Sequence, residues 1–223
     1  MTQRRGVLAA RMWLLSLLDA AERTGIAPLS VERLHRLVYL ANAMAPVYDL
    51  LTPDGYLLKF KRGPFFPEVQ WDMDRLSVQG LAAVSGLKRM KDDQGWWFEA
   101  NYSLTRTGMA AVDRALILGE VRHKASFLRE VVRAFAAILR EEASDEPPGD
   151  ADDVLLKDVA FTRADLEGPI DFRTASENLT ALAAGAIGLR VGGDRSVGRR
   201  AEVHLYFRYL EQLWDRRHEQ AVA

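Results

Sequence analysis

The chain has no cysteine among its 223 residues. That absence excludes disulfides, thiolate zinc ligands and cysteine nucleophiles, and it is typical of a reducing compartment, so we expect a cytoplasmic protein. No segment contains the roughly 18 uninterrupted apolar residues that a membrane span requires. Arg11 interrupts the apolar stretch that follows the N-terminal arginines and Asp19 ends it, which favours a helix of the fold over a signal peptide. We therefore expect no membrane association.

An excess of charge of one sign is also lacking, since the formal net charge is −1. The balance gives no overall basicity that would point to nucleic acid and no overall acidity that would point to disorder. Signals of enzyme chemistry are scarce as well. The four histidines are isolated, and none has the spacing of a metal-ligand pair: His35, His123, His204 and His218. We predict a protein that is not an enzyme and that needs no metal or cofactor.

One weaker hypothesis for enzyme chemistry stays open. Gly192-Gly193-Asp194 precedes a predicted helix, and the amides at a helix N-terminus can hold an anion. No phosphate-loop lysine and no G-x-G-x-x-G pattern accompanies these glycines, so a plain turn is the favoured interpretation.

The stretch from Arg62 to Gly108 carries the strongest fold signal. Pro67 suits a first helical turn, and Val69, Met73 and Leu76 then recur at i, i+4 and i+7, which predicts a helix that ends near Gly80. Two β-prone runs, 81–90 and 96–104, flank a turn-rich segment and predict a hairpin.

Capping residues predict the neighbouring helices. Thr105 is a suitable N-cap for a helix that begins at Arg106. Ser30 is a suitable N-cap for a helix that begins at Val31, and an earlier apolar helix covers about 7–22. Helices followed by a hairpin in this order predict an N-terminal winged helix-turn-helix over residues 1–118.

The second half of the chain predicts helices with one interruption. An amphipathic connecting helix covers 119–142, with Phe127 to Leu139 along its apolar face. An acidic linker follows at 143–153, where two consecutive prolines cannot continue a helix. The C-terminal module, 154–223, begins with an extended or irregular piece over 154–161 and continues with helices near 178–187 and from about Ser196. The predicted fold class is mainly α with one β-hairpin: a winged helix-turn-helix followed by a helical C-terminal module.

Six cations precede the third helix or lie near the hairpin tip. In a winged helix these positions touch phosphates, which makes them a candidate set for binding duplex DNA. The competing interpretation, given equal weight, is that surface hairpins carry lysines for solubility and edge protection. The set comprises Lys59, Lys61, Arg62, Lys88, Arg89 and Lys91.

The third helix favours a protein partner instead. With its apolar stripe on the core, its outer side is expected to carry Glu68, Asp72 and Asp74, and carboxylates are unsuited to a groove lined by phosphates. An exposed tryptophan beside an arginine is typical of interface hot spots. Because Trp96 and Trp97 alternate across the hairpin, one of them is expected to face the core and the other to stand outside. The candidate partner-binding residues are Trp71, Arg75 and Trp97; the alternative for Trp71 is that the C-terminal module covers it.

A family resemblance adds to these inferences. Three successive segments carry it: Leu37 to Asn42, Arg62-Gly63-Pro64-Phe65-Phe66-Pro67-Glu68-Val69, and Asp72 to Leu76. Together they resemble a pattern shared by Panacea-type antitoxin domains and the middle components of ABC-three-component conflict systems. Asp158-Val159-Ala160-Phe161 is loosely similar to a D-x-x-[FY] stretch of the middle components. The resemblance implies a non-enzymatic winged-helix protein that couples an SMC/RecN-like ATPase to an effector, with Gly63, Pro64 and Pro67 as shape-determining positions.

We therefore expect an adaptor or regulator of a bacterial conflict system, directed against phages or mobile elements. It would act through protein contacts, with nonspecific contact between the wing and DNA as an addition. The alternative is a winged-helix transcription regulator that forms a homodimer through the helix of Phe127 to Leu139 or through the last helix.

Overall fold

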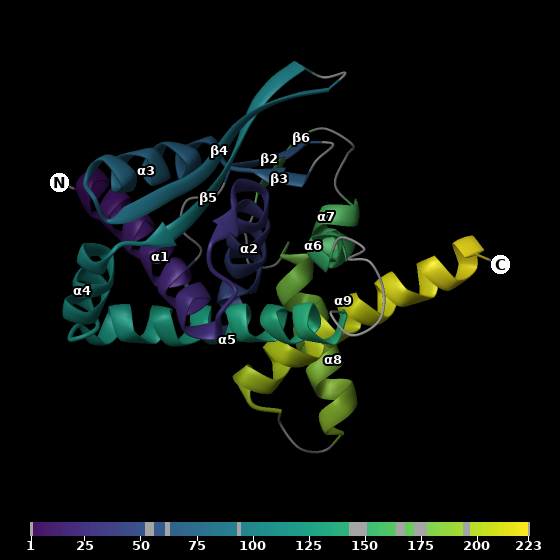
Figure 1. Ribbon diagram of the computed structural model, residues 1–223. Helices are drawn as coiled ribbons and strands as arrows, with labels where there is room; N and C mark the ends of the chain where they lie inside the picture. The colour runs from purple at the N-terminus through teal and green to yellow at the C-terminus, as the bar shows by residue number, and fades with distance from the viewer. Residues whose placement is uncertain are drawn as a thin grey trace.

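The computed structural model describes residues 2–51, 56–60, 63–92, 95–142, 151–163, 168–171, 178–193 and 197–222. Over these residues the protein is mainly helical, as predicted (Figure 1). The α-helices are α1 (Thr2–Thr24), α2 (Val31–Met44), α3 (Pro67–Val78), α4 (Arg106–Ala115), α5 (Gly119–Glu142), α6 (Ala151–Val154), α7 (Val159–Arg163), α8 (Leu179–Gly192) and α9 (Arg199–Val222). Two 3-10 helices accompany them, η1 (Ala45–Tyr48) and η2 (Leu155–Lys157).

The predicted hairpin is part of a larger sheet. Strands β4 (Ala82–Asp92) and β5 (Gly95–Leu104) pair antiparallel, and β1 (Leu29–Ser30) adds a third strand on the other side of β5, with Leu29 opposite Tyr102. The sheet order is therefore β1-β5-β4. Beyond the helices, β4 and β5 continue as a two-stranded ribbon that projects from the body of the protein (Figure 1).

A second sheet makes the prediction of one β-hairpin wrong. Strand β2 (Tyr56–Phe60) pairs with β3 (Gly63–Phe65) on one side and with β6 (Gly168–Asp171) on the other, all antiparallel. These strands are short, two of them contain proline, and β6 comes from the second half of the chain. None of them has the alternating pattern by which a strand is recognised in a sequence.

Side-chain caps fix the helix starts where the sequence predicts them. The Ser30 hydroxyl accepts from the Arg33 amide at 3.1 Å, and the Thr105 hydroxyl accepts from the Gly108 amide at 3.0 Å. Gly80 follows α3 with φ +68°, and the Leu81 amide donates back to the Leu76 carbonyl at 2.9 Å, as in a glycine-ended helix. These three predicted helix boundaries are confirmed.

Gly108 allows α4 to lie against the end of α3. A Cβ atom at this position would lie 2.1 Å from the carbonyl oxygen of Leu81. The Thr105 amide donates to that same oxygen at 3.1 Å, so the backbone of the Thr-Arg-Thr-Gly segment is held directly over the turn that starts β4. Glycine is therefore required here by close approach.

The buried apolar residues of both halves of the chain form one cluster. Trp13 of α1 packs on Phe127 of α5, with ring centroids 5.8 Å apart. The apolar side of α9 joins the same core through Val203, Tyr206, Phe207 and Leu210. The apolar side of α5 is also buried there, including Phe127, Val131, Val132, Phe135 and Ile138. The two apolar faces proposed for dimerisation are thus covered within a single chain.

The segment 154–161, predicted to be extended or irregular, consists instead of short helical turns on either side of Asp158, with Val154 and Leu155 buried. The predicted linker, 143–153, lies outside the described residues except for Ala151, Asp152 and Asp153, which begin α6. Asp153 is tied to the body of the protein, because it accepts from the buried Arg36 of α2 at 3.1 Å.

Candidate interaction surfaces

The exposed side of α3 is the first candidate surface. Trp71 is 62% exposed, and Arg75 and Val78 follow it at i+4 and i+7, so the three share one face of the helix. Val78 is 89% exposed. The described residues of the C-terminal module therefore do not cover Trp71. We call this surface the α3 face; it comprises Glu68, Trp71, Asp74, Arg75 and Val78.

The charge of the α3 face is net negative, with two carboxylates and one guanidinium. Asp72, predicted to lie on the outer side, is instead buried. It accepts from Arg11 of α1 at 2.9 Å, and Arg75 reaches it from the surface at 3.5 Å. The reason is that Arg11 supplies the charge that makes the burial of this carboxylate tolerable. Asp74 remains exposed and accepts from Gln70 at 3.0 Å.

The projecting part of the ribbon is the second candidate surface. Lys88, Arg89 and Lys91 are all exposed, but they do not share a face. Cross-strand pairing places Lys91 opposite Trp96 and Arg89 opposite Phe98 on one side of the ribbon. Lys88 pairs with Glu99, and Met90 with Trp97, on the other side.

Trp96 and Trp97 differ from the expectation. Trp96 lies on the side of β5 that, further along the strand, faces the core, yet it is 59% exposed because the ribbon has left the body of the protein. Trp97, the predicted contact residue, is half-buried. The more accessible tryptophan of the ribbon is therefore Trp96.

The side chains of the other three predicted cations, Lys59, Lys61 and Arg62, are not among those that the structure describes. Lys61 and Arg62 lie outside the described residues, and only the backbone of Lys59 is described, in β2 opposite Pro64 and Gly168. Gly63, which follows them, has φ +123°, and a Cβ there would lie 3.4 Å from both Arg36 Nε and a methyl carbon of Leu156. The glycine of the Gly-Pro-Phe-Phe-Pro motif thus lets the start of β3 lie close to α2.

His35 of α2 fixes the next part of that motif. Its Nδ1 accepts from the Phe66 amide at 3.2 Å, and its ring lies 4.8 Å from the Phe65 ring. Burial lowers the pKa of His35 to about 4, so the ring is neutral at pH 7. A neutral, buried histidine that orients backbone is a structural residue.

A buried carboxylate joins the C-terminal module to α2, and the sequence analysis missed it. Asp158 is fully buried and accepts from the hydroxyls of Tyr39, Thr180 (2.8 Å) and Tyr206 (2.6 Å). It also accepts from the amides of Ala160 and Phe161, each at 3.0 Å, and so caps α7. We call Asp158, Tyr39, Thr180 and Tyr206 the Asp158 cluster. The Asp-x-x-Phe stretch was the one available signal, since Phe161 packs edge-on against Tyr39 at 5.5 Å.

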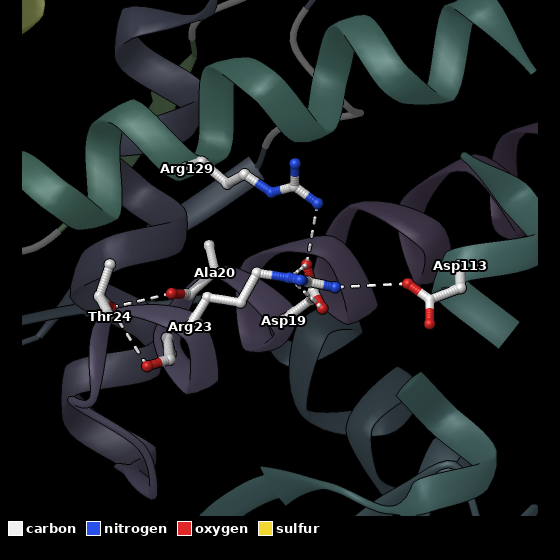
Figure 2. A network of polar contacts seen from close by, with 7 residues as sticks. Asp19, Ala20, Arg23, Thr24, Asp113 and Arg129 are labelled. Atoms are coloured by element: carbon white, nitrogen blue, oxygen red, sulfur yellow. Dashed lines mark hydrogen bonds and ion pairs between the residues drawn. The ribbon is translucent and has the colours of Figure 1, made fainter. Parts of the chain in front are cut away.

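A second polar network joins α1, α4 and α5 (Figure 2). The buried Asp19 accepts from Arg23 at 2.8 Å and from Arg129 at 3.3 Å, and Arg23 also reaches Asp113 at 3.3 Å. Hydrogen bonding to Asp19 is the main cause that raises the pKa of Arg23. Every charge in the network has a partner of opposite sign, which is typical of a structural ion network.

A third network joins α5 to α9. Glu130 accepts from Arg133 at 3.0 Å and from Arg200 at 2.9 Å, and it lies 3.2 Å from the His204 ring. Like the Asp158 cluster, it connects elements that are distant in sequence.

Two small cavities lie among the described residues, and neither has the size of a typical substrate site. One of about 50 Å³ lies between α1, α2 and α3, lined by Trp13 and Asp72 among others, and one of about 110 Å³ lies beside Tyr209 and Leu213. Small-molecule sites are several-fold larger, about 300–1,000 Å³. Within the described ranges, no group of three or more histidine or acidic side chains is arranged to hold a metal ion. None of the helices described here has both the length and the apolar content needed to cross a bilayer.

The proposed anion site at Gly192-Gly193 has the wrong polarity. Gly192 ends α8 and Gly193 is its C-cap, whose amide donates to the Leu189 carbonyl at 3.1 Å. The C-terminal end of a helix presents carbonyl oxygens and repels anions. Asp194 lies outside the described residues, and α9 begins only at Arg199.

Comparison with known proteins adds no identification: no protein-family model, no curated protein and no solved structure matches this chain.

Proposed function

We propose that this chain is a winged-helix adaptor that binds a protein partner through the α3 face. The order α1, β1, α2, α3, β4, β5, with η1, β2 and β3 inserted between α2 and α3 and with β1 beside β5 in an antiparallel sheet, supports the winged-helix assignment. In that assignment α3 is the recognition helix and the β4–β5 ribbon is the wing.

The chemistry of the α3 face is the observation that supports a protein partner. A recognition helix in the major groove lies between two rows of phosphates, and Glu68 and Asp74 would face them. An exposed tryptophan flanked by an arginine and an aliphatic residue has the composition of an interface hot spot. In DNA-binding winged-helix proteins this helix contacts the bases. In the proposed adaptor the same helix binds a protein.

The resemblance to middle components suggests the partner: an SMC/RecN-like ATPase encoded beside this chain, which the adaptor couples to an effector of a bacterial conflict system. This coupling needs no catalytic residue on the adaptor. It needs a rigid body on which separate faces bind separate proteins. The single buried cluster and the three polar networks are consistent with such rigidity.

Co-expression with the neighbouring ATPase tests the proposal. The wild-type chain is expected to co-purify with the ATPase, and Trp71→Ala is expected to weaken this binding by about thirtyfold or more, because truncation of a hot-spot residue costs about 2 kcal/mol or more. Trp96→Ala is the matched control, since it removes an equally exposed indole from a different surface. Wild-type affinity in Trp71→Ala, or an equal loss of affinity in both variants, would count against the α3 face.

A winged-helix regulator that binds duplex DNA is the second candidate, favoured by the exposed Lys88, Arg89 and Lys91. The charge of α3 separates the two functions. If α3 enters a groove, Asp74→Lys strengthens duplex binding, because a carboxylate near phosphates is replaced by a cation. The adaptor proposal expects Asp74→Lys to leave duplex binding unchanged. A dimeric regulator would also need a dimer interface other than the buried sides of α5 and α9.

A further inference from the structure

The ribbon carries an apolar side beyond the point where the body of the protein can cover it. On β5, Ala100, Tyr102 and Leu104 face inward and are buried. The same side of the strand continues outward through Phe98 and Trp96, which are 64% and 59% exposed. Figure 1 shows the ribbon projecting past the helices at this point. The inward-facing pattern is therefore maintained over two residues whose side chains are more than half exposed.

Two cations share this side with the two aromatic rings. The Arg89 guanidinium lies over the Trp96 ring, 3.9 Å from its centroid, and Lys91 Nζ lies 5.2 Å from the same centroid. Arg89 is also the cross-strand neighbour of Phe98. We call Arg89, Lys91, Trp96 and Phe98 the ribbon face. Its four side chains include no carboxylate, and the cross-strand Glu99 lies on the opposite side.

The spacing of these groups matches a repeating polyanion that has exposed rings. Trp96 and Phe98 are two residues apart on one strand, and Arg89 and Lys91 are two residues apart on the other. Each pair is therefore separated by about 7 Å along the ribbon. Unpaired bases in an extended strand present flat faces at a comparable repeat, each with a phosphate beside it, and aromatic side chains on antiparallel strands bind them by stacking.

We propose that the ribbon face binds single-stranded nucleic acid, with bases stacked on Trp96 and Phe98 and phosphates held by Arg89 and Lys91. Duplex DNA is disfavoured, because its bases are already stacked on one another. A wing that contacts only duplex phosphates would leave both exposed rings without a base to stack on. A protein partner is disfavoured, because lysine is depleted at the centre of protein interfaces and, among the described side chains of the ribbon, neither cation shares its side with a carboxylate. The inference concerns a surface separate from the α3 face, so each can fail alone.

Fluorescence anisotropy of the full chain with a labelled oligothymidylate of about twenty nucleotides tests the proposal. The same measurement with a duplex of equal length gives the comparison, and a titration between about 50 and 200 mM salt gives the slope of log affinity against log salt. With two phosphate contacts the slope for the single strand is expected to be about −1.4.

Three variants separate stacking from charge. Trp96→Ala is expected to weaken single-strand binding by about fivefold to a hundredfold without changing the salt slope. The double variant Arg89→Gln and Lys91→Gln is expected to flatten the slope. Leu87→Ala is the matched control and is expected to bind like the wild type, since Leu87 is 66% exposed on the same ribbon but is not part of the ribbon face.

Tighter binding of the single strand than of the duplex, with the loss confined to the ribbon-face variants, supports the inference. Absence of binding at low salt overturns it. Equal affinity for duplex and single strand also overturns it, as does wild-type affinity in Trp96→Ala. Because Trp96 is exposed, equal thermal unfolding temperatures of Trp96→Ala and wild type establish that any loss is local.

Discussion

The Asp158 cluster offers the sharpest test of how the two halves of the chain are held together. Tyr206→Phe keeps the ring in the core and removes the hydroxyl that donates to Asp158 at 2.6 Å. The carboxylate is fully buried and cannot recruit water in its place. A hydrogen bond to a charged group contributes about 1.5–3 kcal/mol, so the free energy of unfolding is expected to fall by that amount.

Urea unfolding at pH 7 measures this loss, with Tyr209→Phe as the matched control. Tyr209 lies on the same helix and is 38% exposed, so its substitution is expected to change the free energy of unfolding by less than about 0.5 kcal/mol. For a chain of this size the Tyr206→Phe loss corresponds to a fall in Tm of about 3–12 °C. A loss below about 0.5 kcal/mol in Tyr206→Phe, or equal losses in both variants, would refute the reasoning.

The pH dependence of the same cluster has a definite sign. Burial first, and Asp158 second, raise the pKa of Tyr206 well above its usual value, and they act in the same direction on Tyr39. The folded state therefore favours the neutral phenols. Their contribution to stability is complete below about pH 10 and is lost as the pH rises further and the unfolded tyrosines ionise. Tyr206→Phe is expected to reduce that alkaline slope.

Two further predictions concern the buried His35 and the closely packed Gly108. The His35 ring, whose pKa falls to about 4, stays neutral when the unfolded chain binds a proton, so stability is lost as the pH falls from 6.5 to 4, by up to about 3 kcal/mol. His35→Leu is expected to flatten this dependence in urea unfolding between pH 7 and pH 5; an unchanged slope would contradict it. Gly108→Ala forces a Cβ against the Leu81 carbonyl and is expected to cost about 1–3 kcal/mol by thermal unfolding. Gly185→Ala, in open space on α8, is its control and is expected to stabilise by about 0.4–1 kcal/mol; the reverse order would show that close approach is not the reason for Gly108.

Local chemistry made several features predictable from the sequence. Ser30 and Thr105 are capping residues with suitable neighbours, and Gly80 is a glycine at the end of an apolar stripe, so each marks a helix boundary without tertiary information. The ribbon was recognisable because both of its long strands are β-prone and flank a turn-rich segment.

The missed features depend on partners that are distant in sequence. Leu29 and Ser30 form a strand only because Tyr102 and Asn101 lie opposite them. Asp72 is buried only because Arg11 meets it from another helix. A carboxylate in a sequence is ordinarily assigned to solvent, so neither Asp72 nor Asp158 could be identified as buried without the positions of their donors.

The exposed surfaces also include features that the local sequence predicts and features that depend on the tertiary fold. The exposure of Trp71 follows from the helical period of α3, but the exposure of Trp96 depends on where the ribbon leaves the core, which no period encodes. The stripes of α5 and α9 were correctly identified as apolar, and only their burial in one shared core shows that a partner is not needed to cover them.

The affinity of the purified chain for the SMC-like ATPase proposed as its partner, measured for the wild type, Trp71→Ala and Trp96→Ala, tests the central proposal most directly. We expect Trp71→Ala to weaken binding by about thirtyfold or more, the equivalent of 2 kcal/mol, and Trp96→Ala to leave it unchanged. Wild-type affinity in Trp71→Ala would contradict the proposal that the α3 face binds the partner.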